Sequence, residues 1–181
     1  MELRKLGNTD LLVSEIGFGT WTIATNWWGQ ADDPSDMLKT AFDCGINFYD
    51  TAPAYGDNGL GETIMAGFIK EHKDEIIVTT KCGYDIHAER PKEHSERPHN
   101  WSRDSIISQT EDSLERLGLE TIDLMQLHNI RLDAVENDEL FETLDDLVEQ
   151  GKIRYYGVSL GPAIGWENEG MISLDKRNIV S

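Results

Sequence analysis

Short runs rich in β-branched residues alternate with amphipathic helical segments, and this alternation constrains the fold more than any other feature of the chain. Strands are predicted at residues 16–21, 46–50, 76–81, 122–128 and 153–159. Helices are predicted between them at residues 34–44, 61–70, 102–117 and 138–150, and glycines at 45, 118 and 151 follow three of these helices as stop signals. Strand–helix–strand units at this spacing indicate a parallel sheet in an α/β fold.

Two architectures accommodate the pattern, a doubly wound open sheet and a (β/α)8 TIM barrel. The doubly wound fold carries a Gly-x-Gly-x-x-Gly fingerprint between a strand and a helix, and Gly17 and Gly19 lack the third glycine. The barrel is therefore favoured, preceded by a β-hairpin formed by residues 3–6 and 11–14. Such barrels typically need about 250 residues, and a sixth strand is predicted to begin only at Asn178–Ser181. We expect one incomplete barrel domain over residues 1–181, without its C-terminal units.

Composition excludes several classes of function. The 16 basic and 34 acidic residues give a net charge of −18, which disfavours binding to nucleic acid. The chain has no 18-residue apolar run and no signal peptide, so we expect no membrane segment and a cytoplasmic location. The two cysteines, Cys44 and Cys82, do not form a disulfide framework. His87, His94 and His99 are too irregularly spaced to predict a metal site, so no metal is expected.

Polar residues occupy the C-terminal ends of successive predicted strands, where barrel enzymes place their catalytic groups. Asp50 ends the second strand, Tyr55 follows in the next loop, Lys81 ends the third strand and His128 ends the fourth. Each residue taken singly also fits a structural role, as a turn former, a solvated strand end or a hydrogen-bonded loop residue. Their recurrence at matching strand ends favours convergence at one mouth of the barrel.

The same stretches resemble the aldo-keto reductase family. Residues 45–56 read Gly-Ile-Asn-Phe-Tyr-Asp-Thr-Ala-Pro-Ala-Tyr-Gly, and residues 78–81, 122–128 and 151–159 resemble the family's lysine, histidine and fifth strands. Leu-Gly-Asn-Thr-Asp at residues 6–10 and Val-Ser-Glu-Ile-Gly-Phe-Gly-Thr-Trp at residues 13–21 also match. The resemblance covers nearly the whole chain, and the ordered set of motifs is highly specific.

The resemblance implies a carbonyl reductase mechanism. Tyr55 would be the general acid that protonates the carbonyl oxygen, and Lys81 would lower the pKa of its phenol, which is about 10 in a free tyrosine. Asp50 would pair with Lys81, and His128 would orient the substrate carbonyl. The hydride would come from a nicotinamide cofactor.

The resemblance also implies where that cofactor binds. Gly19, Thr20, Trp21 and Asp50 would approach the nicotinamide and its ribose, and Ser159 would bind the carboxamide. The family's usual residue after that serine is Asn, and this chain has Leu160. NADP(H) is the expected cofactor, with NAD(H) as the alternative, because the loops that bind the phosphates belong to units beyond residue 181.

Three functions are therefore expected in order. The first is an NAD(P)H-dependent oxidoreductase acting on a small aldehyde or ketone substrate. The second is a non-catalytic, cofactor-binding regulatory protein, because some members of this family are channel-associated β subunits. The third is an inactive fragment, because a half-barrel leaves two sheet edges unpaired. The sequence specifies no oligomeric state.

Overall fold

A computed structural model describes residues 1–25, 33–89, 95–161, 168–177 and 179–180. The elements run, in chain order, β1 (Leu3–Lys5), β2 (Leu12–Ser14), β3 (Phe18–Gly19), α1 (Trp21–Ala24), α2 (Pro34–Asp43), β4 (Phe48–Asp50), α3 (Leu60–His72), β5 (Ile77–Cys82), α4 (Arg103–Leu117), β6 (Ile122–His128), α5 (Leu132–Val135), α6 (Asp138–Glu149), β7 (Ile153–Ser159) and α7 (Glu169–Lys176).

The main sheet has five parallel strands in the order β3-β4-β5-β6-β7, the same as their order along the chain. A doubly wound sheet would reverse direction from a central strand, whereas a barrel adds each strand beside the last. The strand order thus confirms barrel topology. The register pairs Gly19 with Asp50 and His128 with Ser159, so the C-terminal strand ends share one edge.

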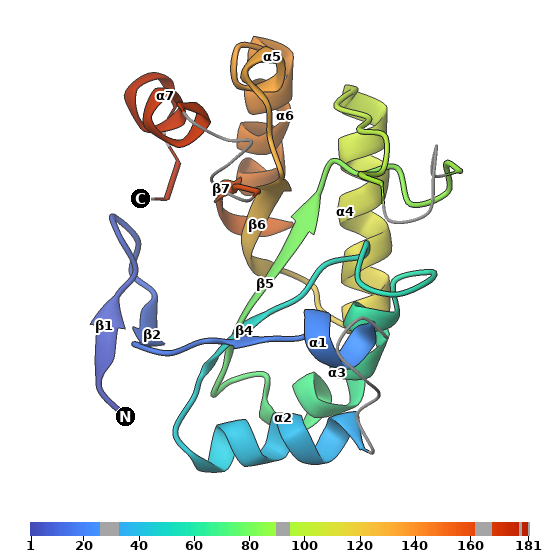
Figure 1. Ribbon diagram of the computed structural model, residues 1–181. Coiled ribbons are helices and arrows are strands. Elements are labelled where there is room, and N and C mark those ends of the chain that lie inside the picture. The colour runs from blue at the N-terminus through green and yellow to red at the C-terminus, as the bar shows by residue number, and fades with distance from the viewer. Residues whose placement is uncertain (26–32, 90–94, 162–167, 178, 181) are drawn as a thin grey trace.

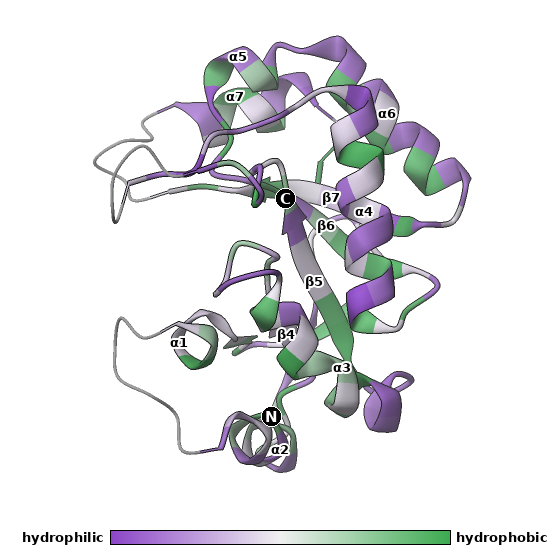
Figure 2. Cartoon of the chain, turned by 90° about the vertical axis from the view of Figure 1, so that its right-hand side faces the viewer, coloured by the Kyte–Doolittle hydropathy of each residue, from purple (hydrophilic) through white to green (hydrophobic). Residues whose placement is uncertain are grey.

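Helices α3, α4 and α6 line one face of this sheet (Figure 1). Alternate strand residues point toward them, and Tyr49, Val78 and Met125 are buried in one hydrophobic core with Leu114 of α4 and Leu144 of α6. Hydrophilic residues follow hydrophobic ones along α4 and α6, as a helix with one buried side requires (Figure 2). We call the opposite side of the sheet, which bears Asp50, Thr79, Lys81 and Gln126, the inner face.

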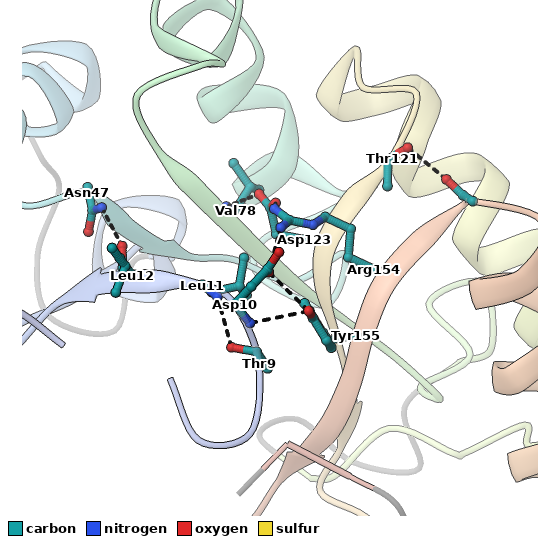
Figure 3. Close-up of polar contacts among 11 residues, drawn as sticks. Thr9, Asp10, Leu11, Leu12, Asn47, Val78, Thr121, Asp123, Arg154 and Tyr155 are labelled. Atoms are coloured by element: carbon teal, nitrogen blue, oxygen red, sulfur yellow. Dashed lines mark hydrogen bonds and ion pairs between the residues drawn. The ribbon is translucent and has the colours of Figure 1, made fainter. Parts of the chain in front are cut away.

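The hairpin of β1 and β2 is antiparallel, as predicted, and covers the N-terminal ends of the strands. Its turn is fastened to the sheet by Asp10, which accepts hydrogen bonds from Arg154 Nη2 at 2.8 Å and from the Tyr155 hydroxyl at 3.0 Å (Figure 3). Arg154 Nη1 also donates to Asp123 at 2.7 Å, and Asp123 in turn accepts from the backbone amide of Val78. Asp10, Asp123 and Arg154 form what we call the amino-end cluster.

Several local expectations are corrected. The first strand is limited to Phe18–Gly19, and Trp21 begins helix α1 instead of ending that strand. Ser102 stands at the N-cap of α4, but its hydroxyl donates to Asn100 rather than capping the helix. Met37 in α2 and Val148 in α6 have the helical spacing of their buried neighbours, yet they are 42% and 36% exposed, because each lies at the margin of the helix's buried stripe.

The described part of residues 82–101, between β5 and α4, is a short hairpin. Tyr84 and His99 form an antiparallel bridge, the Asp85 amide donates to the Pro98 carbonyl, and the Asn100 amide donates to the Gly83 carbonyl. The polar composition of this segment does not indicate the pairing, because the hydrogen bonds that form it are made by the backbone and need no particular side chains. Helices α5 and α7 were also not predicted.

The predicted sixth strand is only partly described. Asn178 and Ser181 lie outside the described residues, and residues 179–180 have no strand assignment. The Val180 amide nevertheless donates to the Tyr156 carbonyl at 3.0 Å, which sets this segment beside β7. None of the helices in the described ranges is both long and apolar enough to cross a bilayer.

Candidate active site

The predicted polar residues meet at the C-terminal edge of the sheet. Asp50 is the last residue of β4, Lys81 is the penultimate residue of β5, and His128 and Ser159 are the last residues of β6 and β7. Parallel strands deliver their carboxyl ends to the same side, so a polar residue at each end enters a common region.

Lys81 is the centre of this group. Its side chain is only 3% exposed, and its ammonium donates to Asp50 Oδ2 at 2.6 Å and to the Thr51 carbonyl at 2.9 Å. The ammonium also lies 4.8 Å from the centroid of the Tyr55 ring. A buried ammonium without a counter-ion is costly, so the Asp50 carboxylate is what permits a charge at this position.

Tyr55 is held beside Lys81 by the turn that leads into α3. The Tyr55 amide donates to the Ala52 carbonyl, and the Tyr55 carbonyl accepts from the Gly61 amide at 2.8 Å. A Cβ on Gly61 would come within 2.9 Å of the Tyr55 Cβ, so glycine is needed for this close approach. The backbone therefore fixes where the phenol enters the mouth.

The pKa of Tyr55 is raised above its ordinary value. Burial is the main cause, Lys81 lowers the pKa by charge and by hydrogen bonding, and Asp50 raises it. The effect of Lys81 has the expected sign, but the expectation of a net lowering is corrected, because desolvation of the phenolate outweighs the neighbouring ammonium.

His128 completes the group and is uncharged at neutral pH. Its ring stands perpendicular to the Tyr55 ring, with centroids 5.8 Å apart. Burial first, and then the charges of Lys81 and His99, hold the pKa of His128 well below its usual value. A neutral imidazole keeps one N–H donor and one acceptor, and this suits it to bind a carbonyl oxygen.

The hairpin after β5 forms an aromatic wall next to His128. The His99 ring is stacked between Tyr84 and Trp101, with centroid distances of 4.3 and 4.8 Å. His99 Nε2 lies 2.9 Å from the His128 carbonyl, and because a carbonyl can only accept, this nitrogen carries the proton. Gly83 has φ +115°, and a side chain there would collide with the Trp101 ring.

The residues expected to hold the nicotinamide are placed in different ways. Gly19 pairs with Asp50 and has open space where a Cβ would stand, which leaves backbone accessible to a flat ring. Trp21 exposes 37% of its surface nearby. Thr20 is fully buried and donates its hydroxyl to Thr51, so it braces β3 against β4. Ser159 is half-buried at the end of β7. The open backbone at Gly19, next to Asp50 in the sheet, offers space of the kind that a nicotinamide and ribose would need.

Gln126 was not among the predicted residues. It follows the inner-face alternation of β6 and bonds directly to Asp50, with Nε2 donating to Asp50 Oδ1 at 2.9 Å. The sequence does carry one sign of this role. Gln126 lies two residues before His128 on the same strand, so both side chains point to the inner face, where a polar group needs a hydrogen-bond partner.

Cys82 is not a reactive neighbour of Lys81. Its side chain points to the helix-covered face and is buried, and burial raises the pKa of its thiol to about 12. Within the described ranges, no group of three or more His, Cys, Asp or Glu side chains is arranged to hold a metal ion. Of the histidines considered for a metal, His94 lies outside the described residues.

Known proteins resemble this chain in sequence. The sequence model of the Aldo/keto reductase family matches residues 15–171. The aldo-keto reductase YhdN of Bacillus subtilis is 36% identical over 163 residues, covering 88% of this chain and 47% of that protein. A putative voltage-gated potassium channel subunit beta of Schizosaccharomyces pombe is 33% identical over 182 residues, covering 98% of this chain and 50% of that protein.

A solved structure is similar as well. The holo form of aldo-keto reductase AKR11C1 from Bacillus halodurans superposes with a TM-score of 0.77 and 33% identity, over 99% of this chain and 55% of that one. The chain thus spans about half the length of the curated relatives it matches.

Proposed function

The chain belongs to the aldo/keto reductase family, and from this premise we propose that it carries the acid–base centre of an NAD(P)H-dependent oxidoreductase that reduces a small aldehyde or ketone. The observation that supports this most is the Lys81 ammonium, buried between Asp50 and Thr51 and facing the Tyr55 ring. A structural lysine has no need of a tyrosine and a neutral histidine at the same strand edge.

Tyr55 protonates the carbonyl oxygen during reduction. Its raised pKa keeps the proton on the phenol at neutral pH, which is the state a general acid needs. As the proton leaves, negative charge develops on the phenolate, and the Lys81 ammonium, which is itself shielded from water, stabilises that charge. Neutral His128 donates a hydrogen bond to the carbonyl oxygen and orients it.

Gly19, Trp21, Asp50 and Ser159 are the residues we propose for the nicotinamide end of the cofactor, and Thr20, buried against Thr51, supports the backbone beside Gly19. When bound, NADP(H), or NAD(H) as the alternative, supplies a hydride to the carbonyl carbon. Leu160, where the family pattern has an amide side chain, leaves Ser159 as the side-chain partner of the carboxamide. We propose the cytoplasm as the compartment, which is consistent with the two free thiols.

The test is carbonyl-dependent oxidation of NADPH by the purified chain, measured together with NADPH binding. Tyr55→Phe is expected to lower turnover by about a hundred-fold or more. NADPH binding should stay intact, because the substitution removes only the phenolic hydroxyl that donates the proton. Tyr155→Phe is the matched control, since that hydroxyl binds Asp10 at the other end of the sheet. Turnover that survives Tyr55→Phe would refute the proposed mechanism.

A regulatory, non-catalytic role is the second candidate, favoured by the similarity to the channel subunit beta from fission yeast. In that case the chain would bind NADPH but oxidise none of it with any carbonyl tested. An inactive fragment would neither bind the cofactor nor turn over. The two assays together therefore separate all three functions.

A further inference from the structure

Gln126 stands on the inner face of β6, directly beside Lys81 in the register of the sheet. Its Nε2 donates to Asp50 Oδ1 at 2.9 Å and to Thr79 Oγ1 at 2.8 Å. We propose that Gln126 is a positioning residue, whose amide sets the orientation of the Asp50 carboxylate and, through it, the place of the Lys81 ammonium. The inference rests on the proposed function, because it concerns how that acid–base centre is held.

The orientation of the Gln126 amide is dictated by its neighbour. An ionised carboxylate only accepts hydrogen bonds, so the amide must present nitrogen and not oxygen to Asp50. The second N–H then falls to Thr79, whose hydroxyl oxygen accepts it. Both donors are committed, so the amide cannot turn over without losing two hydrogen bonds.

The two oxygens of Asp50 consequently have different partners. Oδ1 receives Gln126, and Oδ2 receives Lys81 at 2.6 Å. Two hydrogen bonds from different strands define the plane of the carboxylate, whereas Lys81 alone would allow it to rotate. The Asp50 side chain is 30% exposed, so packing by itself does not restrain it.

The Lys81 ammonium has three N–H donors, and two of them go to Asp50 and to the Thr51 carbonyl. Because these two hydrogen bonds fix the orientation of the ammonium, its third N–H group is available on the side of Tyr55, whose ring centroid lies 4.8 Å from Lys81 Nζ. Gln126 thereby acts on the phenol only through Asp50 and Lys81. It contacts neither the phenol nor the proposed position of the substrate.

Two substitutions separate donation from packing. Gln126→Met keeps the length of the side chain and removes both donors. Gln126→Glu keeps the shape, but its carboxyl can donate to Asp50 only when protonated. Two carboxyls at this separation share a proton over a range of moderate pH and repel each other above it.

The first measurement is kcat and KM for carbonyl reduction as a function of pH. Gln126→Met is expected to lower kcat about ten-fold at every pH, with KM little changed, as expected for a lost hydrogen bond to a charged group. Gln126→Glu is expected to approach the unmodified chain near pH 5 and to fall away as the pH rises toward about 8. This reversible pH dependence within one folded protein cannot come from misfolding.

The second measurement needs no turnover. The phenol of Tyr55 is titrated by its ultraviolet absorbance, as the difference between each protein and the same protein carrying Tyr55→Phe. Gln126→Met is expected to raise the pKa of Tyr55 further, because the ammonium that lowers it is held less firmly. If the unmodified chain reduces no carbonyl, the proposed function fails, and this titration still decides the inference.

Gln109→Met is the matched control. The Gln109 amide also makes two hydrogen bonds, accepting from the Gly83 amide and donating to Ser105, without touching Asp50. It is expected to leave both the Tyr55 titration and the pH profile unchanged. An unaltered Tyr55 titration in Gln126→Met, or a Gln126→Glu profile parallel to that of the unmodified chain, would overturn the proposal.

Discussion

Two clusters of charged side chains join the strands at opposite ends of the same sheet, and they differ in burial more than in chemistry. At the carboxyl end, the Lys81 side chain is 3% exposed and bonds to Asp50. In the amino-end cluster, the Arg154 side chain is 39% exposed and bonds to Asp10 and Asp123. Each cluster places a cation between strands next to carboxylates at 2.6 to 2.8 Å.

Burial gives the two clusters different consequences. Water screens Arg154, so its ion pairs fasten the hairpin and alter little else. Water is largely absent around Lys81, so its charge acts on the pKa values of both Tyr55 and His128. Similar ion pairs therefore attach the hairpin to the sheet at the amino ends of the strands and control the pKa values of Tyr55 and His128 at the carboxyl ends.

Lys81→Met is the strongest test of this difference between the two clusters, and it has the largest expected effect on stability and on the pKa of Tyr55. It leaves the Asp50 carboxylate without its cation, at a cost of about 3 kcal/mol in the free energy of unfolding. The pKa of Tyr55 rises as well, since the ammonium that lowers it is gone. Denaturant unfolding measures the first effect and phenol titration the second.

The double variant Asp50→Asn/Lys81→Met supplies the check on that prediction. Removing both charges relieves the unpaired carboxylate, so the double variant should be more stable than Lys81→Met alone. If instead the two losses simply add, the pair does not behave as a buried unit and the contrast with the amino-end cluster is void.

The pH response of His128 is the next largest effect. Its pKa is lowered in the folded state, so below the ordinary value of about 6.5 the unfolded chain binds the proton more readily than the folded one. Stability is therefore retained above that pH and lost on acidification, by up to about 1.4 kcal/mol per pH unit. Unfolding curves at pH 7 and pH 5 for the unmodified chain and His128→Gln isolate this contribution, which His128→Gln should abolish.

Arg154→Met carries the smallest expected effect. It removes two partly exposed ion pairs, worth together about 1 kcal/mol or less. The loss should shrink further in high salt, and the Tyr55 titration should not move. A loss as large as that of Lys81→Met would show that burial does not distinguish the two clusters.

Much of the fold could be predicted from the hydrophobic periodicity of the strands and helices and from the glycines that end the helices. Strands 122–128 and 153–159 are found with the predicted boundaries, and Gly118 ends α4 in the left-handed conformation with φ +69°. Local patterns sufficed because a buried strand and an amphipathic helix each repeat with their own period. The hairpin bridge between Tyr84 and His99 was not predictable in this way, since backbone pairing in a polar segment leaves no hydrophobic period.

The candidate site was predicted as a set of residues but not as an electrostatic system. Asp50, Tyr55, Lys81 and His128 were expected to converge, and they do. Gln126 was overlooked, although it bonds to Asp50. The net direction of the Tyr55 pKa was also wrong, because two opposed contributions decide it and a sequence contains neither depth of burial nor distance.

The sequence by itself determined the kinds of element, their order and the polar residues at the strand ends, because these depend on local spacing and residue chemistry. Only the tertiary structure decided which oxygen of Asp50 faces Lys81, how deeply Tyr55 and His128 are buried, and that Gln126 holds the carboxylate. Desolvation and hydrogen-bond direction are properties of three-dimensional neighbourhoods, and residues 76 positions apart, such as Asp50 and Gln126, become neighbours only when the sheet forms.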